Sequence, residues 1–269
     1  MIRALTEGDR ATTIAYLSQA PHYNLYMLGN IDKLGFTHEF CEFWGDFADP
    51  NTEPTRLRAV LNRYMTGWTV YGEKDADWQG LGAIVDNHRI SAERLQDNPN
   101  GIDSFLPYLQ RYQGGHSETE EVMALAAADF CAIPAPSNVT IRRGRLTDLA
   151  KLAAFYYNAE HMTRTAAAVE RPLRDTRLWL AEAEGEILAT ALTNAETSNL
   201  AMIGGVYTPA MARGRGLSQA VCSALCADLI HEGKQPILYW STPAAGAVYR
   251  KLGFQPCGEW RSVWLEPKA

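Results

Sequence analysis

The hydrophobic pattern is clearest in the second half of the chain. Short apolar runs bounded by turn residues predict four strands, over residues 177–183, 187–193, 202–208 and 236–240. A helix is predicted over 217–232, because Gly233 follows it as a helix-ending residue. A second helix is predicted from Pro243, since proline suits a first turn and the apolar residues that follow share one face. Residues 254–265 are expected to close the sheet with one or two strands.

The first half shows a less regular pattern. Strands are predicted over 68–71 and 80–85, and the polar residues 72–79 connect them. Residues 102–112 are expected to form a helix. The apolar segment 122–130 is an element whose type the pattern leaves open.

A proline-rich connector divides the chain. Ile133-Pro134-Ala135-Pro136-Ser137-Asn138 cannot continue a helix and favours an extended backbone. Each part opens with a short strand, a turn with Thr and Asp, and a helix, at residues 2–17 and again from 139. We therefore predict two domains of related architecture, 1–137 and 138–269, in the α/β (α+β) class.

Charge is distributed unevenly between these parts. Residues 1–137 contain 10 Lys and Arg against 19 Asp and Glu, a net charge of −9, and the remaining 15 and 12 give +3, for a total of −6. No dense basic stripe or nucleic-acid motif occurs, so nucleic acid is not expected as a partner. No apolar run is long enough for a bilayer, and the N-terminus lacks a signal-peptide core, so we expect no membrane association and a cytoplasmic location.

The five cysteines do not indicate a metal site. They form no C-x-x-C pair, and Cys222 and Cys226 lie one helical turn apart in an apolar helix. Because a structural zinc site needs more ligands than this spacing offers, both are interpreted as core residues, and no metal is expected.

The segment with the clearest chemistry is Ala212-Arg213-Gly214-Arg215-Gly216-Leu217-Ser218, between a predicted strand and a predicted helix. The first N–H groups of a helix lack internal partners and carry partial positive charge, and glycines allow a ligand close to the backbone. This arrangement predicts a phosphate site, although two glycines in an ordinary turn would give the same pattern. Gly114-Gly115 is a weaker candidate, because the three carboxylates within residues 116–121 would repel a phosphate.

The second part of the chain resembles the GNAT superfamily of N-acetyltransferases in the order of its elements. That order is a strand, the Arg-Gly-Arg-Gly turn, a helix, a second strand and a helix with the pattern Tyr-x-x-x-Gly-Phe. Two motif regions carry this resemblance, residues 206–218 and 244–254, the second ending Tyr249-Arg250-Lys251-Leu252-Gly253-Phe254. The resemblance implies a mixed, mostly antiparallel sheet flanked by helices, with acetyl-CoA or another acyl-CoA as the donor. The pyrophosphate would lie on the backbone of Arg213, Gly214, Arg215, Gly216, Leu217 and Ser218. The pantetheine arm would pair with Val206, Tyr207 and Thr208 like an added strand.

Tyr249 matches the family position of a general acid that protonates the departing CoA thiolate. The alternative is a core tyrosine on the apolar face of its helix. The family asparagine seven residues earlier is Thr242, whose hydroxyl can still bond the pantetheine, and Met211 replaces a frequent Gln or Arg.

No carboxylate lies on the strand 202–208, where some members carry a general base. Candidates for that role remain elsewhere in the second part: Glu160, His161 and Glu196, and Tyr207 acting through a water.

Residues 23–31, followed by Gly35, resemble the N-terminal part of two-domain bacterial GNAT proteins. The resemblance implies a degenerate first domain that forms a wall of the acceptor site and binds no CoA of its own. Its acidity suggests a cationic acceptor.

The leading hypothesis is an N-acetyltransferase that moves an acetyl group from acetyl-CoA, by direct attack, to a primary amine of a small molecule or of an amino-acid-like acceptor. A catalytically impaired acyl-CoA-binding module is the alternative. An aminoacyl-tRNA-using transferase is disfavoured by the overall acidity. Oligomeric state is left open.

Overall fold

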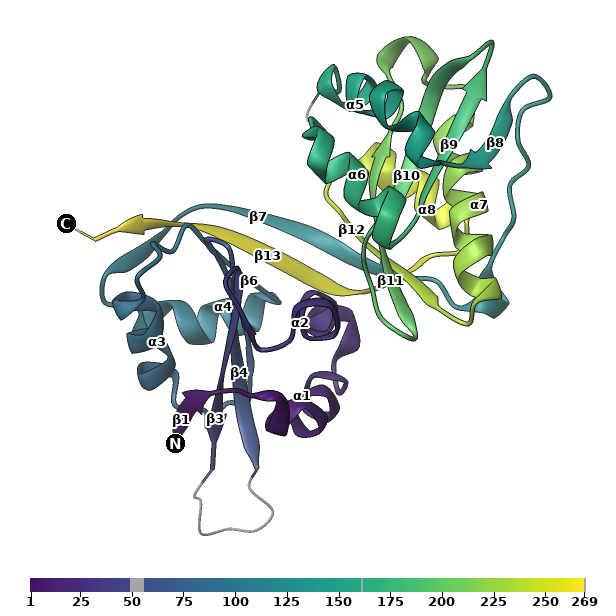
Figure 1. Ribbon diagram of the computed structural model, residues 1–269. Coiled ribbons are helices and arrows are strands. Elements are labelled where there is room, and N and C mark those ends of the chain that lie inside the picture. Colours follow the sequence, from purple (N-terminus) through teal and green to yellow (C-terminus); the bar gives the residue numbers. More distant parts are fainter. Residues whose placement is uncertain (49–55, 161, 269) are drawn as a thin grey trace. The chain divides into compact units, whose positions relative to one another are not determined.

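The structure is a computed structural model that describes residues 1–48, 56–160 and 162–268. The chain forms two compact units (Figure 1). The first comprises Met1–Glu121 and Gly258–Ala269, and the second comprises Val122–Cys257. Residues 122–137, predicted to end the first domain, therefore pack with the second unit, and the last strand of the chain packs largely with the first.

The second unit is built on a mixed sheet in the order β7-β12-β11-β10-β9-β8. Its strands are β8 (Thr140–Arg143), β9 (Leu178–Ala183), β10 (Glu186–Glu196), β11 (Leu200–Tyr207), β12 (Gln235–Trp240) and the last three residues, 122–124, of β7 (Tyr112–Ala124), whose preceding residues belong to the first unit. The strand pairs from β8 to β11 are antiparallel, whereas β11 and β12 are parallel. Beside β12, Leu125 N–H donates to the Pro236 carbonyl at 2.9 Å.

Helices cover both faces of this sheet. They are α5 (Leu149–Tyr157), α6 (Ala166–Asp175), α7 (Leu217–His231) and α8 (Pro243–Lys251). Ala181 and Ala191 pack with α7 and α8, whereas their neighbours Leu180 and Leu192 pack with α5 and α6. This alternation follows from the two-residue period of a strand. Cys222 and Cys226 are fully buried in the α7 core, as predicted.

The first unit has its main strands and helices in the same order along the chain as the second. Its sheet runs β1-β3-β4-β5-β6-β13, and β2 pairs with β3. The strands are β1 (Ile2–Ala4), β2 (Thr37–His38), β3 (Cys41–Phe47), β4 (Leu57–Tyr64), β5 (Gly67–Gly72), β6 (Arg94–Asp97) and β13 (Gln255–Pro267). The helices are α1 (Arg10–Leu17), α2 (Pro21–Leu34), α3 (Trp78–Asn87) and α4 (Pro99–Phe105). As in the second unit, one central strand pair, β5 with β6, is parallel.

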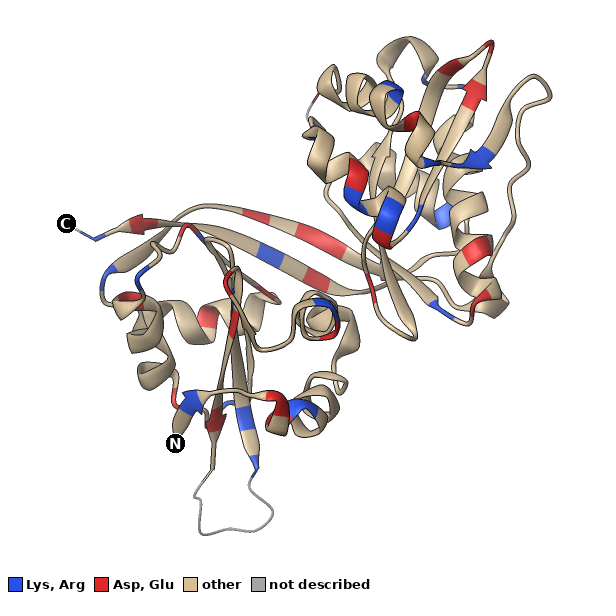
Figure 2. Ribbon diagram, viewed as in Figure 1, with Lys and Arg blue, Asp and Glu red and all other residues tan. Residues whose placement is uncertain are grey.

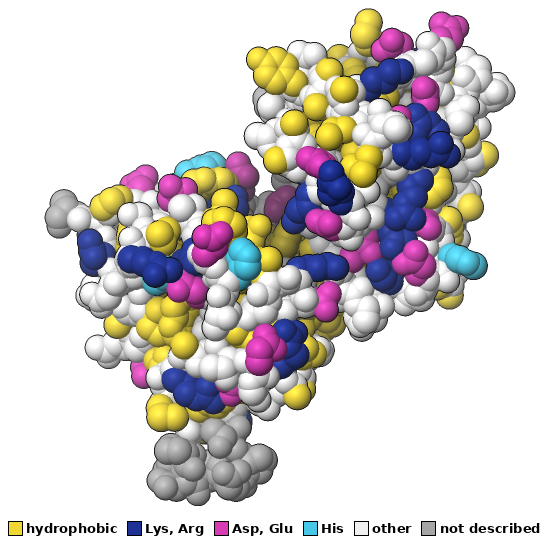
Figure 3. All heavy atoms as spheres, in the orientation of Figure 1, with side chains coloured by type: hydrophobic (Ala, Val, Ile, Leu, Met, Phe, Trp, Pro, Cys, Tyr) yellow, Lys and Arg dark blue, Asp and Glu magenta, His cyan; other side chains and the backbone are white. Residues whose placement is uncertain are grey.

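The short helical turns of the described residues are Glu7–Asp9, Leu106–Tyr108, Ala127–Asp129, Leu146–Asp148 and Ala210–Ala212. Among the described helices, none combines the length and the apolar character that crossing a membrane requires. Both units expose a mixture of charged, polar and apolar side chains (Figure 3).

The strand predicted over 80–85 was wrong, because these residues lie in α3. Asp77 caps that helix by accepting from Gly80 N–H at 2.9 Å. Helical spacing is seen in the buried positions Trp78, Leu81, Gly82 and Val85. Gly82 packs against the Tyr108 carbonyl so closely that a Cβ would lie 2.7 Å from its oxygen, which leaves room only for the hydrogen of a glycine. A glycine on a buried helix face hides the helical period from the hydrophobic pattern.

The helix predicted over 102–112 is shorter, since α4 ends at Phe105 and β7 begins at Tyr112. The segment 122–130 contains the end of β7 and a helical turn. Gly114 and Gly115 lie inside β7 rather than in a loop, and Figure 2 shows the acidic positions along that strand. Residues 254–265 form one strand, β13.

Candidate functional site

The two parallel strands of the second unit separate at the middle of β11. Their register runs from Leu200 opposite Gln235 to Ile203 opposite Leu238 and ends there. Beyond that point β11 continues against β10 alone as far as Tyr207. The edge of β11 at Val206 to Thr208 is therefore turned toward space that β12 does not fill, which suits an added extended chain.

A bulge at Gly205 lies just beyond the point of separation. Thr190 lies opposite Tyr207, but Leu192 lies opposite Gly204, so β11 has one extra residue in between. Gly205 adopts a φ of +55°, and a Cβ there would lie 2.7 Å from Leu192, so glycine is needed for both reasons.

Tyr156 fixes the bulge from the α5 side. Its buried hydroxyl donates to the Gly205 carbonyl at 2.6 Å and lies 2.7 Å from Thr190 Oγ1. Burial raises the pKa of Tyr156 to about 12. The phenol therefore stays protonated and remains a donor to the bulge.

The glycine turn follows directly after β11. The helical turn Ala210–Ala212 leads to Gly214 and Gly216, with φ of +78° and +75°, and α7 begins at Leu217. Apart from its chain neighbours, no atom of the described residues lies within 4 Å of a Cβ built on Gly214, so the turn is open. The N–H groups of residues 217–219 lack partners within the helix, because the first helical bond is from Ala220 to Gly216. This geometry supports the predicted phosphate site.

The two arginines of the turn differ in their contacts. Arg213 donates Nε to the Thr208 carbonyl at 3.0 Å and lies 3.6 Å from the Glu160 carboxylate. Among the described residues, no carboxylate lies within 4.0 Å of exposed Arg215, which leaves it available to an anionic ligand.

Helix α8 carries the two remaining predicted site residues. Thr242 is the exposed N-cap residue, and its carbonyl, not its hydroxyl, accepts from Ala245 and Gly246. Tyr249 is 7% exposed and belongs to the same core cluster as Leu217, at the start of α7.

Burial raises the pKa of Tyr249, and its position beside the thiols Cys222 and Cys226 adds to this. The phenol is therefore protonated at neutral pH. The core position favours a structural role in the ligand-free chain, whereas a protonated phenol is what a general acid requires.

The indole of Trp240, at the end of β12, is a further polar group near the site that was not predicted from the sequence. Trp240 lies against Gly246, where a Cβ would be only 2.4 Å from the indole, and Arg250 lies 5.0 Å over the ring. The buried Trp240 Nε1 has no hydrogen-bond partner among the described residues. The same holds for the hydroxyl of Thr208.

The candidate bases are in different situations. Glu160 is exposed beside Arg213, and Tyr207 is buried with its ring 5.3 Å from Phe155. His161 lies outside the described residues. Glu196 is fully engaged in a buried charge network, so its carboxylate is not free to accept a proton from an amine.

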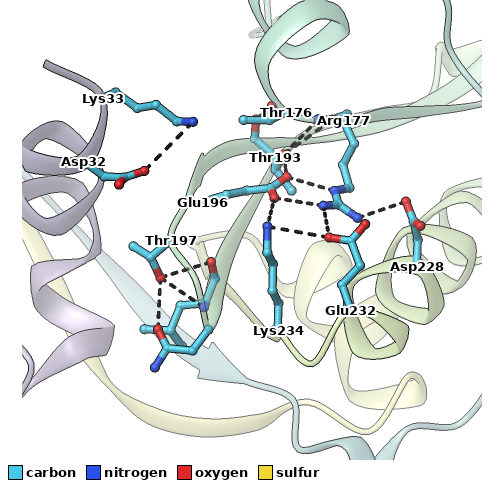
Figure 4. A network of polar contacts seen from close by, with 12 residues as sticks. Asp32, Lys33, Thr176, Arg177, Thr193, Glu196, Thr197, Asp228, Glu232 and Lys234 are labelled. Atoms are coloured by element: carbon cyan, nitrogen blue, oxygen red, sulfur yellow. Dashed lines mark hydrogen bonds and ion pairs between the residues drawn. The ribbon is translucent and has the colours of Figure 1, made fainter.

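That network joins the far end of α7 to the sheet (Figure 4). Glu196 accepts from Arg177 at 2.9 and 3.0 Å, from Lys234 at 2.5 Å and from Thr193 at 2.7 Å. Arg177 also contacts Glu232 at 2.6 Å and Asp228 at 3.1 Å. Burial would raise the pKa of Glu196, but the hydrogen bonds from Arg177, Lys234 and Thr193 outweigh it, and the pKa is lowered.

The first unit has a different turn at the equivalent point. Residues 73–77, between β5 and α3, contain three carboxylates and no glycine. The carboxylate of Asp77 already occupies the Gly80 N–H at the start of α3. A diphosphate would meet negative charge there instead of free donors.

The arrangement of elements in each unit, with a parallel strand pair that separates before a helix, defines the GNAT fold in tandem. Residues 183–265, under a third of the chain, match the model of the family described as FR47-like protein. Among curated proteins, none matches this sequence.

Solved structures resemble the chain over nearly its whole length. A Drosophila protein is 15% identical, with a TM-score of 0.72, and the match covers 100% of this chain and 99% of that one. A GCN5-related N-acetyltransferase from Sphaerobacter thermophilus is 19% identical, with a TM-score of 0.67 and coverage of 99% and 95%. A tandem GNAT protein from the clavulanic acid biosynthesis pathway is 14% identical, with a TM-score of 0.63 and coverage of 99% and 98%. The predicted fold class and the resemblance to the GNAT superfamily are confirmed.

Proposed function

We propose that the chain is an acyl-CoA-dependent N-acyltransferase that moves an acetyl group from acetyl-CoA to a primary amine of a small molecule. The observation that carries this proposal is the open turn at Gly214 and Gly216, placed where β11 and β12 separate. Helix N–H donors and Arg215 supply convergent positive charge for a diphosphate. The likeness of the fold to proteins described as N-acetyltransferases supports the same reaction class.

In this proposal the donor lies along the second unit. The pyrophosphate binds the backbone of residues 213–218, and the pantetheine arm pairs with Val206, Tyr207 and Thr208. Exposed Thr242 offers a hydroxyl to the arm at the start of α8. Thr208 Oγ1 and Trp240 Nε1 have no hydrogen-bond partner among the described residues, but both atoms are enclosed, so they could bond the arm only after a local side-chain movement.

The chemistry is direct attack of the neutral amine on the thioester carbonyl. A tetrahedral intermediate forms, the carbon–sulfur bond breaks, and the amide leaves with CoA thiolate. Tyr249 gives its proton to the thiolate sulfur, and the proton lost by the amine restores the phenol through solvent. A group that stays protonated through neutral pH is suited to this role.

The second candidate is an acyl-CoA-binding module without catalysis. The core position of Tyr249, at 7% exposure, is the observation that favours it. Mass spectrometry after incubation of the chain with acetyl-CoA and a panel of primary amines distinguishes the two. Acetylated amine supports the enzyme, whereas binding of acetyl-CoA with no product from any amine supports the module.

Replacing Tyr249 by Phe tests the assignment of the acid. We expect kcat to fall by roughly 100-fold or more, with a small change in the KM for acetyl-CoA, because the phenol acts on the departing sulfur. Unchanged kcat in Tyr249→Phe would remove Tyr249 from the mechanism and leave it a core residue.

A further inference from the structure

Two arginines of the second unit converge on one residue beside the β11 bulge. Arg164, in the loop between α5 and α6, donates Nη2 to Asn194 Oδ1 at 3.3 Å. Arg171, on α6, donates Nη2 to the backbone carbonyl of Asn194 at 3.1 Å. The Asn194 amide lies directly over Gly204 of β11, since a Cβ on Gly204 would be 2.0 Å from Asn194 Nδ2. Both guanidinium groups are thereby held close to the bulge.

Neither of these two arginines has a counter-ion among the described residues. In the part of the chain that the structure describes, no carboxylate lies within 4.0 Å of either one, whereas Arg142, Arg174 and Arg177 each have an acidic partner. Arg164 is half-buried, and its Nε is enclosed with no hydrogen-bond partner among the described residues. A partly buried charge without a partner is unfavourable, so this guanidinium is suited to an anion that arrives from outside the chain.

The stacking of Arg164 on Tyr156 orients the group. The guanidinium carbon lies 5.7 Å from the centre of the Tyr156 ring, and the hydroxyl of the same tyrosine holds the Gly205 carbonyl. One side chain therefore links the position of Arg164 to the position of the bulge. Because Nε is enclosed and Nη2 already donates to Asn194, an incoming anion would meet the Nη1 group and the second N–H of Nη2.

This site lies where the proposed acyl group would be. The inference rests on the proposed function, in which the pantetheine arm runs from the glycine turn back along Thr208 to Val206. The next residues in that direction are Gly205 and Gly204, and Asn194 covers Gly204. The arginines are thus on the acceptor side of the thioester end of the arm.

We infer that Arg164, assisted by Arg171, binds a carboxylate of the acceptor, so that the acceptor class is a primary amine that also carries a carboxylate, as an amino acid does. The planar guanidinium fork matches a carboxylate with two parallel hydrogen bonds. An anchored carboxylate would hold the nearby amine against the thioester carbonyl. Arg164 is a specificity-determining residue in this arrangement and takes no part in proton transfer.

The test compares amino acids with the corresponding amino acid amides as acceptors for the full chain and acetyl-CoA. The parent should prefer the acids in kcat/KM by roughly tenfold or more. In Arg164→Gln the KM for the acids should rise roughly 10- to 100-fold, because the variant loses one hydrogen-bonded charge pair with the carboxylate. The kcat and the KM for acetyl-CoA should change little. Arg164→Lys should recover part of the effect. Arg174→Gln is the matched control, because Arg174 lies on α6, the helix that follows Arg164, and has the acidic partner Glu170; it should behave as the parent.

The outcomes separate this inference from the proposed function. Equal use of acids and amides by the parent, or an equal loss for both in Arg164→Gln, overturns the carboxylate site while acyl transfer stands. If no amine is acetylated, the proposed function fails, and calorimetric titration of the acetyl-CoA-bound chain with the same acids and amides decides the site. Binding of acids that Arg164→Gln abolishes supports the site, and absent or indiscriminate binding overturns it.

Discussion

Replacing Glu196 by Gln should destabilise the second unit without impairing acyl transfer. Glu196 is 8% exposed and receives donors from Arg177, Lys234 and Thr193. Gln keeps one acceptor oxygen but turns an NH2 group toward cationic donors. Removing one partner of a buried ion pair costs about 3–5 kcal/mol. Because Arg177 keeps Glu232 and Asp228, we expect about 2–3 kcal/mol here.

Thermal unfolding followed by circular dichroism measures this loss. At roughly 3 °C per kcal/mol for a unit of this size, the variant should melt roughly 6–9 °C below the parent. Glu186→Gln is the matched control, because Glu186 is exposed near the start of the same strand, and its melting temperature should not move. Below the melting range, kcat of Glu196→Gln should equal that of the parent.

The effect should depend on pH with a defined sign. The pKa of Glu196 is lowered in the folded chain, so its contribution to stability is complete above the ordinary carboxyl pKa of 4.5. The contribution is lost as the pH falls through the lower folded value. The melting difference between parent and variant should therefore be full near pH 7 and shrink below 4.5. An unchanged melting temperature together with a 100-fold loss of kcat would refute this reasoning and make Glu196 a catalytic base.

Two further predictions concern the donor site. Gly214→Ala adds a methyl group at the open turn and should raise the Kd for acetyl-CoA by roughly tenfold. Gly185→Ala is the control, because Gly185 also has a positive φ and open space; it should cost similar stability (about 1 kcal/mol) and leave the Kd unchanged. Equal Kd values in the two variants would count against the turn as the phosphate site. Calorimetric titration of the parent should give one acetyl-CoA per chain, because the acidic turn at residues 73–77 cannot hold a diphosphate, and two equivalent sites would contradict this.

Local chemistry made the strand, turn and helix around the proposed donor site predictable. The strand, glycine turn and helix at residues 200–231 lie consecutively in the chain, so propensity and motif point to the same structure. The helix α3 was missed for a local reason as well, since Gly80 and Gly82 interrupt the apolar period that Trp78 and Val85 would otherwise show.

Non-local pairing made the rest unpredictable. Arg164 and Asn194 are 30 residues apart and meet only through a loop and an irregularity in the pairing of β10 with β11. The charge network at Glu196 gathers residues from 177 to 234. No spacing rule in the sequence links such positions, because the contacts of side chains in loops and bulges are determined by the tertiary fold.

The two units differ at the turn on which the proposed donor site depends. Both place a turn between the first strand of a parallel pair and the following helix. In the second unit that turn has positive-φ glycines and leaves the first N–H groups of α7 open. In the first unit Asp77 takes an N–H group at the start of α3 for itself, which stabilises the helix and adds negative charge where a phosphate would bind. Under the proposed function, a carboxylate cap and a bound phosphate compete for the same N–H groups, so a capped turn and a phosphate-binding turn are alternatives at this point of the fold.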